Sequence, residues 1–171
     1  MERLFKAIFI TAFAALILTN PWFDGLDLLS VPGWRTISES EKLDKCISWE
    51  KEAAEDLGIE EIPTIEVRST FNVSDTLCGM YQPWDNKIIL YMDNIDDLFR
   101  AYNTVCHETR HAYQLQEINN GTEIGKTFSE SYVNYVTYDT NEKDYRSQYI
   151  EVDARDYATK RTLSNWAHVL F

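Results

Sequence analysis

Cysteine is scarce in this sequence, and the few cysteines form no pattern. Among 171 residues there are three, Cys46, Cys78 and Cys106, and no CxxC spacing joins any two of them. An odd count without such spacing argues against a disulfide-stapled fold. Cys106 directly precedes His107. Because neighbours on a helix point about 100° apart, we expect Cys106 to face the core and not to share a ligand site with His107.

Positive charge is also in short supply. The chain has 16 Lys and Arg against 28 Asp and Glu, which gives a net charge of −12. A net field of this sign disfavours nucleic acid and anionic lipid, so we expect no nucleic-acid partner. It favours a cationic substrate or partner, with solubility alone as the simpler explanation. A hydrophobic content of 44% and an aromatic content of 13% argue against a disordered chain and fit one domain with a core.

A hydrophobic run long enough to span a bilayer with ease is missing as well. The longest apolar stretch, residues 7–18, falls short of the roughly 20 residues that a spanning helix needs. Arg3 and Lys6 before it are typical of a secretory signal, but no A-x-A-like cleavage site follows. Residues 1–20 are therefore predicted to be a signal, an anchor or a buried helix, with possible membrane contact through residues 4–18. Export or anchoring is favoured over a cytoplasmic location.

The rest of the chain is predicted to be a linker, residues 21–37, and an α+β domain, residues 38–171. The linker is expected to pack loosely on the domain. Ser38 and Glu41 form a capping-box pair at the start of the first helix. The patterns then predict a helix over 38–58, a strand over 62–69, a hairpin over 76–92 with its turn at 83–86, a helix over 97–119, an irregular or short-helical stretch, and a helix over 149–171. This order favours a small, mostly antiparallel sheet packed on helices.

Histidine is as scarce as cysteine, yet two of the three histidines are four residues apart. His107 and His111 lie within one predicted amphipathic helix, with Glu108 directly after the first. Residues i and i+4 share a helix face, so both imidazoles can reach one Zn²⁺ ion. Glu108 lies beside that face, where a general base for metal-activated water is needed. The alternative is a surface helix with two solvated histidines.

A catalytic zinc needs a third protein ligand, and the last predicted helix offers candidates. Glu151 and Asp153 lie there, and His168 lies near the C-terminus. Glu151 is the better candidate, because it shares a helix face with small residues that would let this helix approach the His107 helix. Asp153 is expected either to pair with Arg110 or to accept a hydrogen bond from a histidine N–H. A solvated surface charge is the alternative for each carboxylate.

Two segments together resemble a family. The first is H-E-T-R-H-A-Y-Q, which starts at His107, and the second is Y-x-x-Q-x-x-E-x-D-A, which starts at Tyr145. They are similar to compact gluzincin-type zinc metallopeptidases, with the layout of the ImmA/IrrE group, and to a group of bacterial and phage-associated zinc peptidase domains. The resemblance covers about residues 40–165. It implies a minimal zincin-like fold and Glu151 as the third zinc ligand.

These observations predict a zinc-dependent endopeptidase that acts on a protein or peptide substrate. Glu108 would be the general base, and Tyr145 and Tyr149 are candidate donors to the oxyanion, although packed rings are the alternative. One strand of the 77–92 hairpin is expected to be an edge strand along which an extended substrate binds. Two other functions stay open: a non-catalytic zinc-fold binding protein, and a membrane-associated accessory protein.

Overall fold

The computed structural model describes residues 33–70, 74, 76–138 and 140–170, with side chains described up to residue 165. The predicted apolar segment at residues 1–20, most of the predicted linker and the side chain of His168 lie outside the described residues. In the part of the chain that the structure describes, no helix is both long and apolar enough to cross a membrane.

The α+β class is confirmed. The elements in chain order are α2 (Glu39–Leu57), β1 (Thr64–Val67), β2 (Gly79–Gln82), β3 (Lys87–Leu90), the short 3-10 helix η2 (Met92–Asn94), α3 (Leu98–Asn119), α4 (Glu123–Val133), α5 (Glu142–Ser147) and α6 (Tyr149–Leu170). From residue 38 onward, each helix and strand that the sequence predicts is present within a few residues of its expected ends. The stretch expected to be irregular or short-helical holds α4 and α5.

Helix α2 shows how local sequence sets the ends of an element. The Ser38 side chain accepts a hydrogen bond from the backbone N–H of Glu41, whose own side chain bonds back to the N-cap, so the predicted capping box is present. Two of the free N–H groups at the helix start are thereby satisfied. At the other end Gly58 takes a left-handed conformation, with φ of 67°, that costs little without a Cβ.

The sheet is mixed. Its strand order is β1-β3-β2, with β2 and β3 antiparallel, as the hairpin predicts, and β1 and β3 parallel. The expectation of a mostly antiparallel sheet therefore holds for the hairpin alone. After β1 the chain crosses over to form β2 at the far edge and then returns along the middle as β3, and such a crossover is what parallel neighbours require. As a result β2 is an edge strand.

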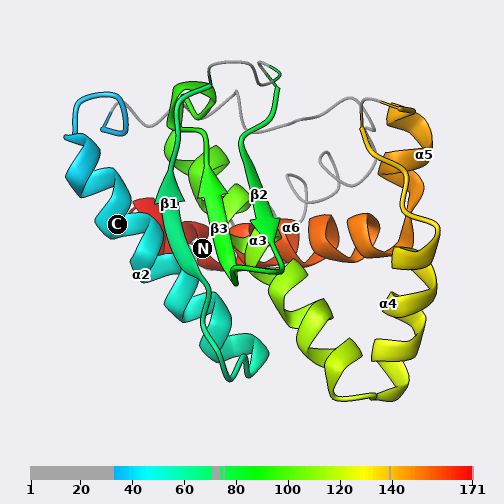
Figure 1. Ribbon diagram of the computed structural model, residues 1–171. Coiled ribbons are helices and arrows are strands. Elements are labelled where there is room, and N and C mark those ends of the chain that lie inside the picture. The colour runs from blue at the N-terminus through cyan, green and yellow to red at the C-terminus, as the bar shows by residue number, and fades with distance from the viewer. Residues whose placement is uncertain (1–32, 71–73, 75, 139, 171) are drawn as a thin grey trace, which may run out of the picture.

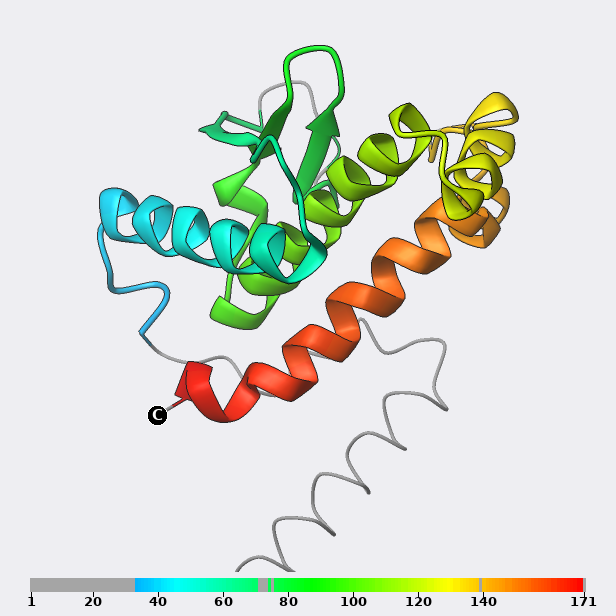
Figure 2. The same cartoon turned by 90° about the horizontal axis from the view of Figure 1, so that it is seen from below.

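Helix α3 is the centre of the molecule. It packs against α6, α2, α4 and β2. The sheet and α6 lie on opposite sides of it, as Figures 1 and 2 show. The small residues predicted for α6 explain the close approach, because Ala154 and Ala158 are fully buried, as is Ile150. A side chain from α3 can thus meet either the edge strand or the last helix.

The end of the predicted linker belongs to the core. Trp34 is 1% exposed, and its indole N–H donates to the carbonyl of Ile95 at 3.1 Å. It packs in the cluster that holds Ile88, Leu90 and Val105. The prediction of a loosely packed linker is therefore wrong at this residue. A tryptophan without periodic neighbours carries no pattern that predicts burial, but its large apolar surface and its indole donor are both satisfied inside.

Candidate metal centre

Helix α3 carries His107, Glu108 and His111 on a rigid support. The helix begins at its N-cap Asp97, whose side chain accepts from the N–H of Arg100 at 2.7 Å, and it continues for 22 residues. More than half of these residues are buried. Cys106 is fully buried in the core, as predicted. The two histidines consequently project from a helix that packing holds in place.

Glu151 on α6 meets these two histidines. Its Oε2 lies 3.5 Å from His107 Nε2, and its Oε1 lies 3.6 Å from His111 Nε2. The two Nε2 atoms are 3.1 Å apart. Side chains from two helices, 40 and 44 positions apart in the sequence, thus direct their ligand atoms toward one point. Within the described residues, this is the one cluster whose donor set could hold a metal ion.

The three side chains lie close enough together to share one ion, because one ligand atom from each lies within 4.8 Å of the other two. Ligand atoms about 2.0–2.1 Å from a tetrahedral Zn²⁺ lie about 3.3 Å from each other, and the two Nε2 atoms, 3.1 Å apart, are close to that spacing. Oε2 of Glu151 is also buried without a hydrogen-bond partner among the described residues. A buried carboxylate oxygen in that state is costly unless something binds it. Two imidazoles and one carboxylate are a ligand set of catalytic zinc sites, which keep a fourth position open.

The charge of Glu151 fits the same role. Burial alone would raise its pKa, but His107 and His111 outweigh that effect and hold the pKa at about 2. The carboxyl is therefore ionised at neutral pH, as a metal ligand must be. Arg155, one helical turn further along α6, places its guanidinium 3.8 Å from Oε2 and adds to the stabilisation of the anion.

A hydrogen-bond chain fixes the ring of His111. Its Nδ1 lies 2.9 Å from Oε1 of Gln114, whose amide nitrogen donates to the carbonyl of Ile150 and to a carboxylate oxygen of Asp153. Because the amide nitrogen faces two acceptors, the amide oxygen must face the imidazole, and Nδ1 must carry the proton. The lone pair is then on Nε2, the atom that points at the cluster. Gln114 therefore selects the tautomer that can bind metal.

Asp153 supports this chain from behind. Arg110 donates to it twice, at 2.8 and 3.0 Å, in a bidentate pair whose side chains are 17% and 18% exposed. The predicted pairing of Asp153 with Arg110 is thus present. The alternative, in which Asp153 accepts directly from a histidine, is not what the structure has, because Gln114 lies between them.

Glu108 lies beside the ligands and outside their set. It is 7% exposed, and burial raises its pKa to about 7, with the negative charge of Glu151 adding to the shift. The backbone N–H of Tyr81 in β2 donates to its carboxylate. A Cβ on Gly79 would lie 3.3 Å from Cγ of Glu108, so the edge strand lies directly against this residue. A carboxyl that changes protonation near neutral pH is suited to proton transfer.

Tyrosines surround the carboxylate of Glu151. The hydroxyl of Tyr135 donates to Oε1 at 3.1 Å. Tyr145, one of the two predicted oxyanion donors, lies near Glu151, whose charge adds to the effect of burial in raising the pKa of Tyr145, and its ring packs edge-on against that of Tyr135. Tyr149, the other predicted donor, packs against Phe128 instead, and no described contact joins it to the cluster. Of the two predicted tyrosines, the structure brings only Tyr145 to the site.

The roles of Gln114 and Tyr135 are absent from the sequence prediction. Gln114 lies three residues after His111, within reach on the next helical turn, so the helix geometry carried a usable signal. Tyr135 lies in the irregular segment after α4, among several other tyrosines, where no spacing distinguishes one ring from the next.

Comparison with known proteins adds no relative. No family model, no curated protein and no solved structure matches this chain.

Proposed function

We propose that this chain is a zinc-dependent endopeptidase. The observation that carries the proposal is the joint placement of three metal-ligand atoms, from His107, His111 and Glu151, beside a fourth group, Glu108, that is not a ligand. A purely structural zinc site closes its fourth position with a protein ligand and has no use for a buried carboxyl next to it.

Zinc bound by these three residues would supply Lewis-acid chemistry, which activates water and polarises a carbonyl oxygen. The chain's own residues would do the rest. Glu108 takes the proton of the attacking water and passes it to the leaving amine. The hydroxyl of Tyr145 offers a hydrogen bond to the developing oxyanion. Gln114 keeps the His111 ring in its binding tautomer throughout.

The edge strand β2 offers a backbone template for the substrate. The N–H of Tyr91 donates to the carbonyl of Cys78, so hydrogen-bonded pairing with β3 falls on every second residue, and Gly79 and Tyr81 direct their backbone groups away from β3. Gly79 is buried and the N–H of Tyr81 donates to Glu108, which leaves the carbonyl of Tyr81 as the backbone group that a substrate can reach. An extended peptide can add there as a further strand, beside Glu108. Binding through the backbone suits a protein or peptide substrate.

The test of this proposal is hydrolysis of unfolded casein by the zinc-loaded chain, with Glu108→Gln as the matched variant. The amide keeps the size of the side chain but cannot take a proton. We expect the variant to retain zinc and fold and to lose at least about 100-fold in turnover. Full activity in Glu108→Gln would contradict the assigned role. Absence of cleavage by the zinc-loaded wild type would favour a non-catalytic zinc-binding protein instead.

A further inference from the structure

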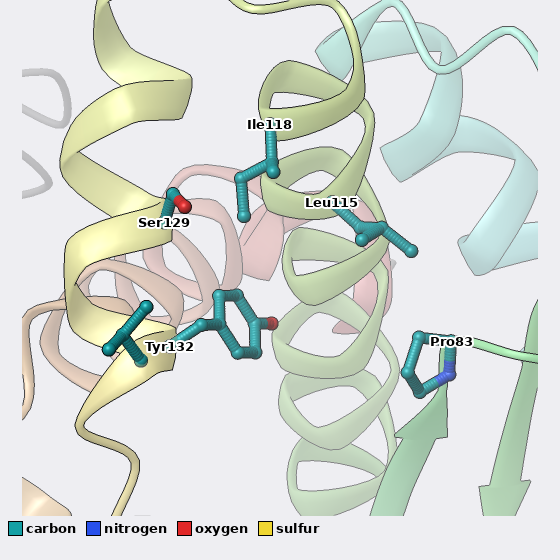
Figure 3. A pocket seen from close by; sticks show the side chains of 6 residues that line it. Pro83, Leu115, Ile118, Ser129 and Tyr132 are labelled. Atoms are coloured by element: carbon teal, nitrogen blue, oxygen red, sulfur yellow. The ribbon is translucent and has the colours of Figure 1, made fainter.

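An apolar pocket lies next to the metal centre. It has a volume of about 320 Å³ and is lined by Pro83, Leu115, Ile118, Ser129, Tyr132 and Val133. Figure 3 shows Leu115 and Ile118 on α3, the ring of Tyr132 reaching across from α4, and Pro83 on the opposite side. The pocket therefore lies between α4 and the turn that follows β2, with α3 as its floor.

The pocket continues the surface that carries the metal ligands. Leu115 lies one helical turn after His111 on α3, and Ile118 lies almost one turn further. At 1.5 Å per residue, these side chains are about 6 and 10 Å from His111 along the helix. The side wall is shared too, because the ring of Tyr132 stacks on the ring of Tyr135, whose hydroxyl donates to Glu151. Tyr132 is thus close to both the pocket and the site.

The direction of β2 decides which part of a bound peptide reaches the pocket. The strand runs from Gly79, which lies over Glu108, to Gln82, and Pro83 at the pocket follows directly. A peptide that pairs with this edge in the more stable antiparallel sense runs the opposite way, from the pocket toward Glu108. Its residues at the pocket consequently precede the bond that is cut. At about 3.4 Å per residue, a separation of 6 to 10 Å corresponds to two or three residues.

We propose that this pocket binds an apolar side chain of the substrate, two or three residues before the scissile bond. The inference rests on the proposed peptidase function and adds a specificity to it. The lining has no charged residue, and its polar side-chain groups are the hydroxyls of Ser129 and Tyr132. Its volume is at the lower end of ligand pockets, which suits one or two side chains and not a cofactor. A leucine or an aromatic residue matches both properties.

Ser129→Phe is the variant that tests the pocket. Ser129 is only partly exposed and lies at the pocket wall, so a phenyl ring there would occupy the space without replacing a core residue. Thr127→Phe is its matched control, because Thr127 lies exposed on the same helix and is not part of the lining. The zinc-loaded wild type and both variants are incubated with a pool of randomised peptides, and the products are sequenced by mass spectrometry.

We expect bulky apolar residues to be enriched at least about 10-fold at the second or third position before the cut in the wild type, as a pocket of this kind discriminates by that order. The enrichment should persist in Thr127→Phe and disappear in Ser129→Phe. Cleavage without this preference, or with a preference that Ser129→Phe leaves intact, would overturn the inference while the proposed peptidase function stands.

A binding measurement separates the two proposals if no peptide is cut. Acetyl-trileucine amide is titrated into zinc-loaded Glu108→Gln, with acetyl-trialanine amide as control, and the methyl resonances of Leu115 and Ile118 are followed. Saturable chemical-shift changes with the leucine peptide and not with the alanine peptide would support binding in the pocket, provided that they disappear when Ser129→Phe is combined with Glu108→Gln. Absence of cleavage would then contradict the proposed hydrolysis and leave the pocket intact. Equal chemical-shift changes with both peptides, or no change with either, would overturn the proposal that the pocket binds an apolar side chain.

Discussion

The amide oxygen of Gln114 lies 2.9 Å from Nδ1 of His111, and the amide nitrogen is held by Ile150 and Asp153. The Nε2 atom of His111, which faces the proposed metal site, thus depends on a residue outside the three proposed ligands. The same contact joins α3 to α6, the two helices that supply the three ligands. The ligand geometry and the packing of these helices are therefore maintained together.

Gln114→Ala should weaken zinc binding by about 10- to 100-fold, because the ring of His111 loses the partner that fixes its tautomer and orientation. Competition with a chelator of known affinity measures the change. Gln116→Ala is the control: Gln116 lies on the same helix and bonds to Gly58 and Glu60, away from the ligands. Equal zinc affinity in wild type and Gln114→Ala would show that His111 binds zinc equally well without the hydrogen bond to Gln114.

Asp153→Ala should destabilise the fold by about 2 kcal/mol, because it leaves the partly buried guanidinium of Arg110 without its bidentate partner. Urea unfolding of the metal-free chain measures this. Zinc affinity should fall less than in Glu151→Ala, since Asp153 acts on the ligands only through Gln114. If Asp153→Ala removes zinc and Glu151→Ala does not, the assignment of the third ligand is wrong.

Gly79→Ala should displace the edge strand from α3. The added Cβ would lie 2.7 Å from Cγ2 of Thr104, closer than real Cβ contacts, and 3.2 Å from the carbonyl oxygen of Ile89. Overpacking of this kind costs about 1–3 kcal/mol. Thr104→Ser removes the methyl group that the added Cβ would contact most closely. The double variant, Gly79→Ala with Thr104→Ser, should therefore recover part of the lost free energy of unfolding, measured in urea. If the changes in free energy of unfolding caused by the two single substitutions simply add in the double variant, the predicted clash is contradicted.

Glu50 should make the fold less stable as the pH rises toward 8. This side chain on α2 is 2% exposed, and its Oε1 lacks a hydrogen-bond partner among the described residues. Burial raises its pKa from 4.5 to about 7, with a smaller opposing effect of Lys51. Between these pKa values the folded chain binds more protons than the unfolded chain, so the free energy of unfolding falls as pH rises.

The total loss amounts to about 3 kcal/mol, since each pKa unit is worth about 1.4 kcal/mol. Glu50→Gln stays neutral at every pH and isolates this effect from other titrations. The variant should match the wild type at pH 4.5 and exceed it in free energy of unfolding at pH 8. A difference between the two proteins that is the same at both pH values would contradict the raised pKa.

The parts of this structure that follow from the sequence are those set by short spacing. The capping box at Ser38, the hairpin turn and the HExxH helix each depend on residues within a few positions of one another. The ion pair of Arg110 with Asp153 and the approach of α6 to α3 were also predictable, because small residues on one face of α6 leave room for a neighbouring helix.

The parts that the sequence leaves open depend on distant contacts. The parallel pairing of β1 with β3 is set by a crossover, and no local pattern in residues 64–67 distinguishes it from an antiparallel pair. Trp34 is buried because a core distant in the sequence accepts it. Tyr135 reaches Glu151 from an irregular segment whose course is determined by packing, while Tyr149, on the predicted helix, faces away.

The most direct test of the metal centre is the zinc content of the purified full-length chain, measured by elemental analysis for wild type and Glu151→Ala side by side. Asp156→Ala is the control, since it removes an exposed carboxylate from the same helix. About one zinc per chain in wild type and Asp156→Ala, lost in Glu151→Ala, is the predicted result. A wild type without zinc after reconstitution, or a Glu151→Ala variant that keeps its zinc, would contradict the three-ligand site.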